Sequence, residues 1–295
     1  MGTHRAGVIP QTESCSQLIS SLLALSTRGI SHLLGVYAHA GHSYSSISST
    51  TAINFLRLEF EALLLTAASI QSASPSTPLT LSVGATPTTT SVRNLLLQHD
   101  DPESDEGKAI AALKATIESI RSINCRVEIH AGVYCVLDLQ QLATHALPAS
   151  QLTYSDLALS VVAEVISLYP GRGKNGSLEV LIGSGSLALA REPCKAYPGW
   201  GIVAPWNIAG ASVPTAGVEG HAGWQVERIN QEHGILCWKG EVGKEDKLEV
   251  GQKVRVWPNH ACMTSACFSW FLVVDGSVKG KEDDIVDVWP RWTGW

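Results

Sequence analysis

The chain has 295 residues, of which 45% are hydrophobic and 16% are charged, so it is long enough for one large core or two modest domains. Its formal net charge is −6 and it has no basic run or basic–aromatic stripe, which argues against a nucleic-acid partner. The longest apolar stretches, 62–70 and 157–168, are far shorter than the roughly 20 residues that cross a bilayer, and residues 1–7 lack the apolar core of a signal peptide.

The cysteine content indicates a reducing compartment. There are seven cysteines, an odd number without regular spacing, which argues against a disulfide framework. We therefore expect a soluble, cytoplasmic protein that has neither a membrane nor a nucleic acid as its partner.

Helices and strands are predicted to alternate along the first part of the chain. Apolar residues at helical spacing predict helices over 15–28, 49–69 and 108–120. In the second helix the apolar face is predicted to carry Phe55, Leu58, Ala62 and Leu65. Short apolar runs predict strands over 32–37, 79–83, 126–130, 157–168 and 178–182. This alternation is typical of parallel βα units, so the expected fold class is α/β, with a partial (β/α) barrel of the TIM type over residues 1–193.

The character of the sequence changes near residue 194. Helical periodicity disappears, tryptophan becomes frequent, and short β-type runs occupy 225–229, 234–238, 253–257, 270–274 and 285–289. The sequence therefore predicts a second, all-β domain over residues 194–295.

Polar loops follow several of the predicted strands at the end where βα barrels and open α/β sheets build their sites. Thr86 and Thr88 lie in a hydroxyl-rich loop after one strand, and Gly132 and Val133 follow another. Their hydroxyls and backbone amides are good donors to a phosphate group. Hydroxyl-rich loops are also typical turns and helix caps, so both interpretations stay open.

Groups able to transfer protons or donate hydrogen bonds gather near these loops. The loop after the first predicted strand carries Tyr37, His39, His42 and Tyr44. Arg5 lies in an earlier loop, where a guanidinium could hold an anionic or phenolic oxygen. Glu128 and His130 point the same way along a strand. Taken alone, such a side chain is more often structural than functional.

A histidine and a cysteine near the end of the chain suggest a metal site. His260 and Cys262 are two residues apart, after a β-type run and Pro258, so both can reach one ion. A soft thiolate with an imidazole suits zinc, and two protein ligands leave positions for water or substrate. The alternative is a loop histidine beside a buried small cysteine. A phosphate site beside polar groups and a metal fits pyridoxal phosphate as the cofactor.

The motifs together resemble the eukaryotic D-serine dehydratases, which have the alanine-racemase-like fold of pyridoxal phosphate enzymes. The matching segments appear in family order over nearly the whole chain, at 2–8, 35–44, 82–88, 128–134, 138–141, 231–234, 258–262 and 288–295. Each segment is short, and the specificity lies in their combination.

The resemblance implies a pyridoxal phosphate barrel with a C-terminal β-domain, usually assembled as a homodimer, that converts D-serine to pyruvate and ammonia. It implies that the residues matching His260 and Cys262 hold zinc, which helps the substrate hydroxyl to leave. The implied phosphate-binding and cofactor-binding residues are Thr86, Thr88, Gly132, Val133 and Tyr134. The implied catalytic residues around the cofactor ring are Arg5, His39 and Tyr44, with Glu128 as a further candidate for that wall.

The family's aldimine lysine has no counterpart here. In the family it lies on the first barrel strand, before the segment that matches residues 2–8, whereas the first lysine of this chain is Lys108 and the next are Lys114, Lys174 and Lys195. We therefore expect an N-terminally truncated relative.

Two alternatives to the dehydratase follow. The first is a catalytically inactive remnant that binds metal or partners. The second is a D-threonine aldolase relative. That branch is similar in fold but is typified by a His-x-Asp metal pair with a harder ligand, so the soft thiolate of Cys262 favours the dehydratase.

Overall fold

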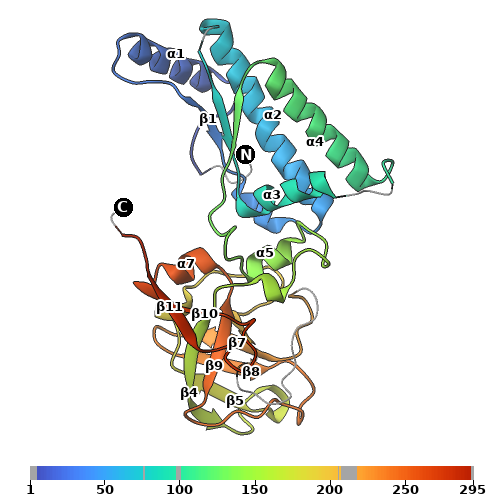
Figure 1. The fold of residues 1–295 in the computed structure, drawn as a ribbon, viewed down its shortest axis with the longest axis vertical. Coiled ribbons are helices and arrows are strands. Elements are labelled where there is room, and N and C mark those ends of the chain that lie inside the picture. Colours follow the sequence, from blue (N-terminus) through green and yellow to red (C-terminus); the bar gives the residue numbers. More distant parts are fainter. Residues whose placement is uncertain (1–4, 76, 98–100, 205, 207–217, 294–295) are drawn as a thin grey trace. The chain divides into compact units, whose positions relative to one another are not determined.

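The computed structural model describes residues 5–75, 77–97, 101–204, 206 and 218–293. It divides into two compact units, one of residues 1–135 and 140–156 and the other of residues 136–139 and 157–295. The first unit is α/β and the second is built mainly of β-strands, as the sequence predicts (Figure 1).

A three-stranded parallel sheet forms the centre of the first unit. Its strands are β1 (Gly35–Ala38), β2 (Thr80–Val83) and β3 (Arg126–Ile129), in spatial order β1-β2-β3. The register sets Tyr37, Ser82 and Glu128 side by side in one row. Because neighbours in a row share a face of the sheet, three polar side chains lie together on the same side.

Helices cover the other face of this sheet. They are α2 (Ser49–Ala73) and α4 (Asp105–Ser122), which lie side by side in Figure 1, and α1 (Glu13–Thr27) packs against α2. Leu81 and Val83, which alternate with Thr80 and Ser82 along β2, are buried in the core that these helices form with the sheet. The alternation of apolar and polar residues in β2 therefore fixes which face meets the helices.

The predicted apolar face of α2 was wrong. The buried residues of α2 are Ala52, Ile53, Leu56, Glu59, Phe60, Leu63, Ala67 and Ile70. Leu58 and Leu65, which the prediction placed inside, are 46% and 45% exposed. The helix is apolar around much of its circumference, so periodicity alone does not identify the buried face. The face that is buried also contains Glu59, and a glutamate ordinarily indicates a solvent-exposed face.

The second unit is a closed barrel of six strands. Their spatial order is β4-β5-β8-β7-β6-β9, and their bounds are β4 (Val161–Tyr169), β5 (Glu179–Ile182), β6 (Gly201–Ala204), β7 (Trp224–Ile229), β8 (Gly234–Trp238) and β9 (Lys253–Pro258). All neighbouring strands are antiparallel. Closure of the barrel leaves none of these strands with an open edge.

The second unit begins earlier than the predicted boundary at residue 193. The apolar runs at 157–168 and 178–182 form strands, as predicted, but they pair antiparallel as β4 and β5 in the barrel. A buried, β-branched run has the same appearance in a parallel and in an antiparallel sheet when both of its faces are covered. The sequence pattern therefore predicts that these strands exist, but not which strands they pair with or in which direction.

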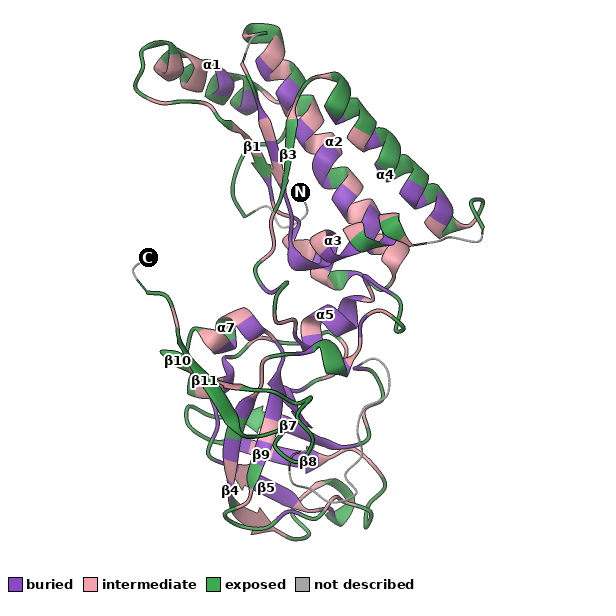
Figure 2. Ribbon diagram, in the orientation of Figure 1, coloured by how far each residue is buried: buried purple, intermediate pink, exposed green. Residues whose placement is uncertain are grey.

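Short elements and a hairpin complete the two units. The short helices are α3 (Thr86–Ser91), α5 (Leu139–Thr144), α6 (Ser186–Leu189) and α7 (Ala261–Ser265). The hairpin pairs β10 (Trp270–Val274) with β11 (Ile285–Pro290), and Figure 2 shows β11 exposed along its length. Within the described ranges, no helix has both the length and the apolar character that crossing a bilayer requires.

The core of the first unit gives a test of the fold. Leu81 is fully buried on the central strand, so Leu81→Ala should lower the free energy of unfolding by about 2–5 kcal/mol through lost burial and a cavity. Urea titration followed by circular dichroism measures this change. The matched control is Leu96→Ala, because Leu96 is 86% exposed and its truncation should change the free energy by less than about 0.5 kcal/mol. Equal effects of the two substitutions would contradict the placement of β2.

Candidate functional site

Hydrogen bonds join the segments that follow β2 and β3. The backbone amide of Val133 donates to the Thr86 hydroxyl at 3.2 Å, and both residues are almost completely buried. Two of the predicted phosphate-binding residues are therefore in contact, although 47 positions separate them in the sequence. Hydroxyl and amide groups at the carboxyl ends of parallel strands are the donors that phosphate sites use.

Gly84 allows β2 to approach the end of β3 closely. Its φ is +142°, and a Cβ at this position would lie 2.0 Å from the His130 carbonyl oxygen. The same carbonyl accepts a hydrogen bond from the Thr89 hydroxyl at 2.8 Å. Only glycine fits both the backbone conformation and the contact, so Gly84 keeps the two strand ends together.

His39 joins the end of β1 to the same place. Its Nδ1 lies 2.8 Å from the Gly84 carbonyl oxygen. A carbonyl oxygen only accepts, so Nδ1 must carry the proton and Nε2 is left as an acceptor when the ring is neutral. The contact fixes both the tautomer and the orientation of this predicted catalytic residue.

A buried carboxyl group lies beneath these loops. Glu59 of α2 is fully buried, and its Oε1 accepts a hydrogen bond of 2.6 Å from the backbone amide of Ala40. Burial raises the pKa of Glu59 to about 7, against the lowering effect of hydrogen bonds from Thr88 and from the backbone of Ala40 and Gly84. The sequence analysis missed Glu59; its signal was a lone acidic residue within an apolar helix stripe.

The face of the sheet opposite the helices carries a linked polar row. Ser82 donates to Glu128 at 2.6 Å, and its Oγ lies 3.2 Å from Nδ1 of His130. The Tyr37 ring stacks on the His130 ring with centroids 4.9 Å apart and planes 11° apart. Burial and the nearby His39 lower the pKa of His130. This face therefore offers a neutral imidazole, a stacked aromatic pair and a carboxylate to a planar polar ligand.

The remaining predicted cofactor residues differ in their burial and in their hydrogen bonds. Tyr44 lies in the 3₁₀ turn Gly41–Ser45 that directly follows Ala40. The Thr88 hydroxyl accepts from the Ala85 amide at 3.0 Å and so caps α3, which is the structural role that the sequence left open. Arg5, Gly132 and Tyr134 are exposed. The structure thus brings Thr86, Val133 and His39 together most closely.

The predicted metal ligands lie at the start of α7 in the second unit. His260 is the residue immediately before the helix, and Cys262 is in its first turn. The amide of Ala261, between them, donates to Oδ2 of Asp138 at 2.9 Å, and Asp138 is buried. The two side chains therefore start from a backbone whose position is fixed by a carboxylate far away in the sequence.

Asn259 holds the same loop from its other side. Its side-chain amide donates to the carbonyl oxygens of Glu192 and Gly199 at 2.9 and 2.8 Å, and its oxygen accepts from the Tyr197 hydroxyl at 2.5 Å. Burial lowers the pKa of His260, with Glu192 opposing the change, so the imidazole is neutral near pH 7. Neutral imidazole is the form that binds metal. Among the described residues, no group of three or more histidine, cysteine, aspartate or glutamate side chains forms a metal cage.

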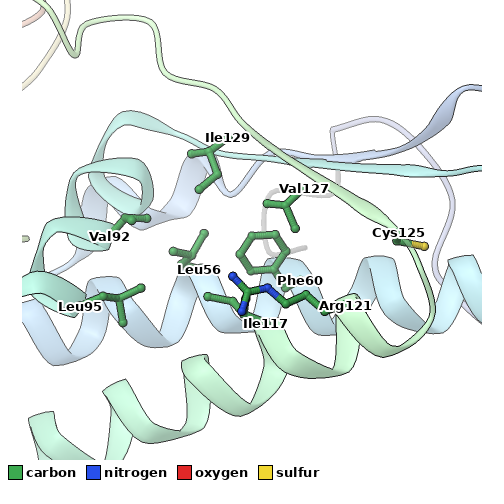
Figure 3. A pocket seen from close by; sticks show the side chains of 9 residues that line it. All are labelled: Leu56, Phe60, Val92, Leu95, Ile117, Arg121, Cys125, Val127 and Ile129. Atoms are coloured by element: carbon green, nitrogen blue, oxygen red, sulfur yellow. The ribbon is translucent and has the colours of Figure 1, made fainter.

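A cavity of about 330 Å³ lies on the helix-covered side of the first unit (Figure 3). Its lining residues are Leu56, Phe60, Val92, Leu95, Ile117, Arg121, Cys125, Val127 and Ile129. None of the predicted site residues is among them, and apart from Arg121 and Cys125 the side chains are hydrocarbon. The cavity therefore lacks the polar groups that a catalytic site needs.

Comparison with known proteins gives matches along the whole chain. The family described as "Putative serine dehydratase domain" matches residues 158–274. The chain is 38% identical over 296 residues to the D-serine dehydratase of Schizosaccharomyces pombe and 33% identical over 298 residues to that of Saccharomyces cerevisiae. Each alignment covers 100% of this chain but 59% and 61% of these relatives. The chain thus spans about three fifths of their length, and its predicted resemblance to D-serine dehydratases is confirmed.

A solved structure has the same fold. D-threo-3-hydroxyaspartate dehydratase from Delftia sp. HT23 superimposes with a TM-score of 0.67 at 25% identity, covering 99% of this chain and 64% of that one. Two solved variants of that enzyme replace a histidine and a cysteine, two positions apart, with alanine, and the cysteine variant is in the metal-free form. The expected α/β architecture with a C-terminal β-domain is confirmed.

The buried carboxyl group gives a test by pH. Because the folded state raises the Glu59 pKa from 4.5 to about 7, it binds a proton more tightly than the unfolded chain does between these values. Wild-type stability should therefore fall as pH rises from about 4.5 to 7, by roughly 3 kcal/mol relative to Glu59→Gln, which does not titrate. Urea titrations of both proteins at pH 5 and pH 7.5 measure the difference. Glu61→Gln, which replaces a partly exposed carboxyl paired with Arg57 on the same helix, is the control. Parallel pH curves for wild type and Glu59→Gln would contradict the burial.

Proposed function

We propose that this chain, a relative of the D-serine dehydratases, carries the pyridoxal-phosphate-binding and zinc-binding parts of a D-serine ammonia-lyase. The reaction of such an enzyme is the elimination that converts D-serine to pyruvate and ammonia. The observation that carries the proposal is the meeting of Thr86, Val133 and His39 at the carboxyl ends of β1, β2 and β3. These residues come from three separate segments that match the family's motifs.

The residues present fit the phosphate and the ring of pyridoxal phosphate. The Thr86 hydroxyl, which accepts from the Val133 amide and keeps its own proton to donate, and the Gly132 amide would hold the phosphate. Gly84 lets the backbone of the β3 exit approach them closely. His39, with Nε2 free to accept, and the His130–Tyr37 pair would contact the ring. Arg5, Thr88, Tyr44 and Tyr134 complete the proposed set. When bound, the cofactor supplies an electron sink for charge that develops at the substrate Cα.

A covalent anchor for the cofactor is missing from this set. The sequences of β1, β2 and β3 contain no lysine, and the first lysine of the chain, Lys108, lies in the first turn of α4. This favours a second candidate function for the 295-residue chain by itself, which is reversible cofactor and metal binding without turnover. The homodimer expected from the resemblance and the cytoplasmic location expected from the cysteine content stay predictions.

Zinc is proposed to bind His260 and Cys262. The thiolate and the neutral imidazole match its preferences, and the loop is anchored by Asp138 and Asn259. The spacing equals that of the two residues replaced in the Delftia variants, one of which is metal-free. A zinc ion with only two protein ligands keeps positions for water and substrate, where it would stabilise the departing hydroxide.

Cofactor binding can be tested directly. We expect the purified chain to bind added pyridoxal phosphate reversibly, with the absorbance of the free aldehyde, and to lose it on dialysis because no site lysine forms a bond to it. Thr86→Val keeps the shape of the side chain but removes the hydroxyl, so it should weaken binding by about tenfold. Thr90→Val is the control, since Thr90 is a buried threonine on the same short helix.

The outcomes of this titration separate the candidates. Fixation of the cofactor onto one lysine by borohydride, together with pyruvate release from D-serine, would show that the chain is itself a complete enzyme. Failure of the wild type to bind the cofactor at all would contradict the proposed site. Acetaldehyde from D-threonine would indicate an aldolase instead, and we expect none.

The metal proposal has its own test. Cys262→Asp exchanges a soft thiolate for a hard carboxylate and should weaken zinc binding by more than about tenfold. Competition with a chromogenic chelator measures the affinity, and mass spectrometry of the dialysed protein measures the stoichiometry. Cys267→Asp is the matched control, because Cys267 is exposed and lies outside α7. Unchanged zinc stoichiometry and affinity in Cys262→Asp would place the metal elsewhere.

A further inference from the structure

Glu59 occupies a position where an apolar side chain would be expected. It is fully buried on α2, in the helix stripe that also contains Leu56, Phe60 and Leu63. Burying a carboxyl group is unfavourable unless its hydrogen bonds compensate. A carboxyl retained in such a stripe therefore calls for a role that a hydrocarbon side chain could not perform.

The contacts of Glu59 reach two of the strand exits. Its Oε1 accepts from the amide of Ala40, 2.6 Å away, in the loop that carries His39 and Tyr44. Its Oε2 is buried without a hydrogen-bond partner among the described residues, and the Thr88 hydroxyl and the Gly84 backbone, in the loop that carries Thr86, lie near enough to lower its pKa. One side chain thus hydrogen-bonds to the loop after β1 and lies beside the loop after β2.

A second contact from the same helix supports the first. Phe55, one turn before Glu59, packs edge-on against the His42 ring with centroids 4.8 Å apart. Residues four apart on a helix lie on one face, so Phe55 and Glu59 present a continuous surface to residues 40–42. The helix therefore supports the loop after β1 at two points, one apolar and one hydrogen-bonded.

We propose that Glu59 is a positioning residue, which holds the loops after β1 and β2 in the arrangement that brings His39 and Thr86 to the cofactor. The inference rests on the proposed function, because it takes pyridoxal phosphate as the ligand of those loops. Loss of the acceptor leaves the buried Ala40 amide without its partner, which favours movement of the loop toward water. Glutamine keeps an oxygen in the same place, whereas leucine does not.

The experiment compares four proteins: wild type, Glu59→Gln, Glu59→Leu and the control Glu61→Gln. The probe is pyridoxine 5′-phosphate, which has no aldehyde and cannot react with surface lysines. We expect Glu59→Leu to raise the Kd by at least about tenfold, Glu59→Gln by less than about threefold, and Glu61→Gln not at all. Rescue by glutamine distinguishes a hydrogen-bond acceptor from a mere filler of space.

Amide hydrogen exchange without ligand supplies a readout that does not depend on cofactor binding. Glu59→Leu should accelerate exchange in residues 40–45 and 84–91 and leave the buried part of α4, around Leu113, unchanged. If Glu59→Leu does not fold, Glu59→Asp takes its place, since the shorter side chain withdraws the acceptor from Ala40.

Each outcome decides a separate point. An unchanged Kd in a folded Glu59→Leu protein, or acceleration spread equally over α4, would overturn the positioning role. A wild type that binds no pyridoxine phosphate, with exchange still accelerated in the two loops of the variant, would reject the proposed function and retain the bracing of the loops by Glu59.

Discussion

The carboxyl ends of three parallel strands are held together by hydrogen bonds between groups that belong to different exits. The Gly84 carbonyl accepts from His39, the His130 carbonyl accepts from Thr89, and the Thr86 hydroxyl accepts from Val133. Each bond joins one exit to its neighbour, so the chain of contacts runs across the whole sheet. The positions of His39, Thr86 and Val133 depend on these bonds, because these residues lie beyond the strands, where the hydrogen bonds between paired strands have ended.

The metal loop follows the same principle with different components. His260 and Cys262 flank a backbone amide that is tied to Asp138, and Asn259 is tied to two carbonyl oxygens and a phenol. Residues that do not bind the metal thus fix the backbone from which the two proposed metal ligands project. In both units the residues that would touch a cofactor or a metal ion are positioned by buried polar neighbours, which is how preorganised sites limit their reorganisation on binding.

Most strands and the long helices could be predicted from the sequence because their signals are local. Apolar runs bounded by glycine or proline gave β1 to β5, and the pair His260 and Cys262 was visible from its spacing. The strand β6 was missed, since Gly201–Ala204 lies among tryptophan, proline and glycine residues that suggest a loop. The buried face of α2 and the antiparallel pairing of β4 depend on contacts with distant segments, which no local period encodes.

The site residues show the same division. Thr86, Val133 and His39 were predicted from loop chemistry and family motifs, and the structure brings them into contact or into adjoining contacts. Glu59 was not predicted, because an acidic residue in an apolar helix is ordinarily assigned to solvent. Its burial follows from the packing of α2 on the sheet, where the loop amide of Ala40 needs an acceptor.

The hairpin of β10 and β11 has a consequence for the behaviour of the protein in solution. Its side chains include Trp270, Leu272, Val288 and Trp289, all of them about half exposed. A two-stranded sheet with solvent-exposed apolar side chains favours self-association of the protein unless charge repulsion opposes it. The net charge of −6 provides that repulsion at pH 7 and vanishes near the isoelectric point of about 5.9. Mild acid would therefore bring the protein toward its solubility minimum, and purification is best kept on the alkaline side of that point.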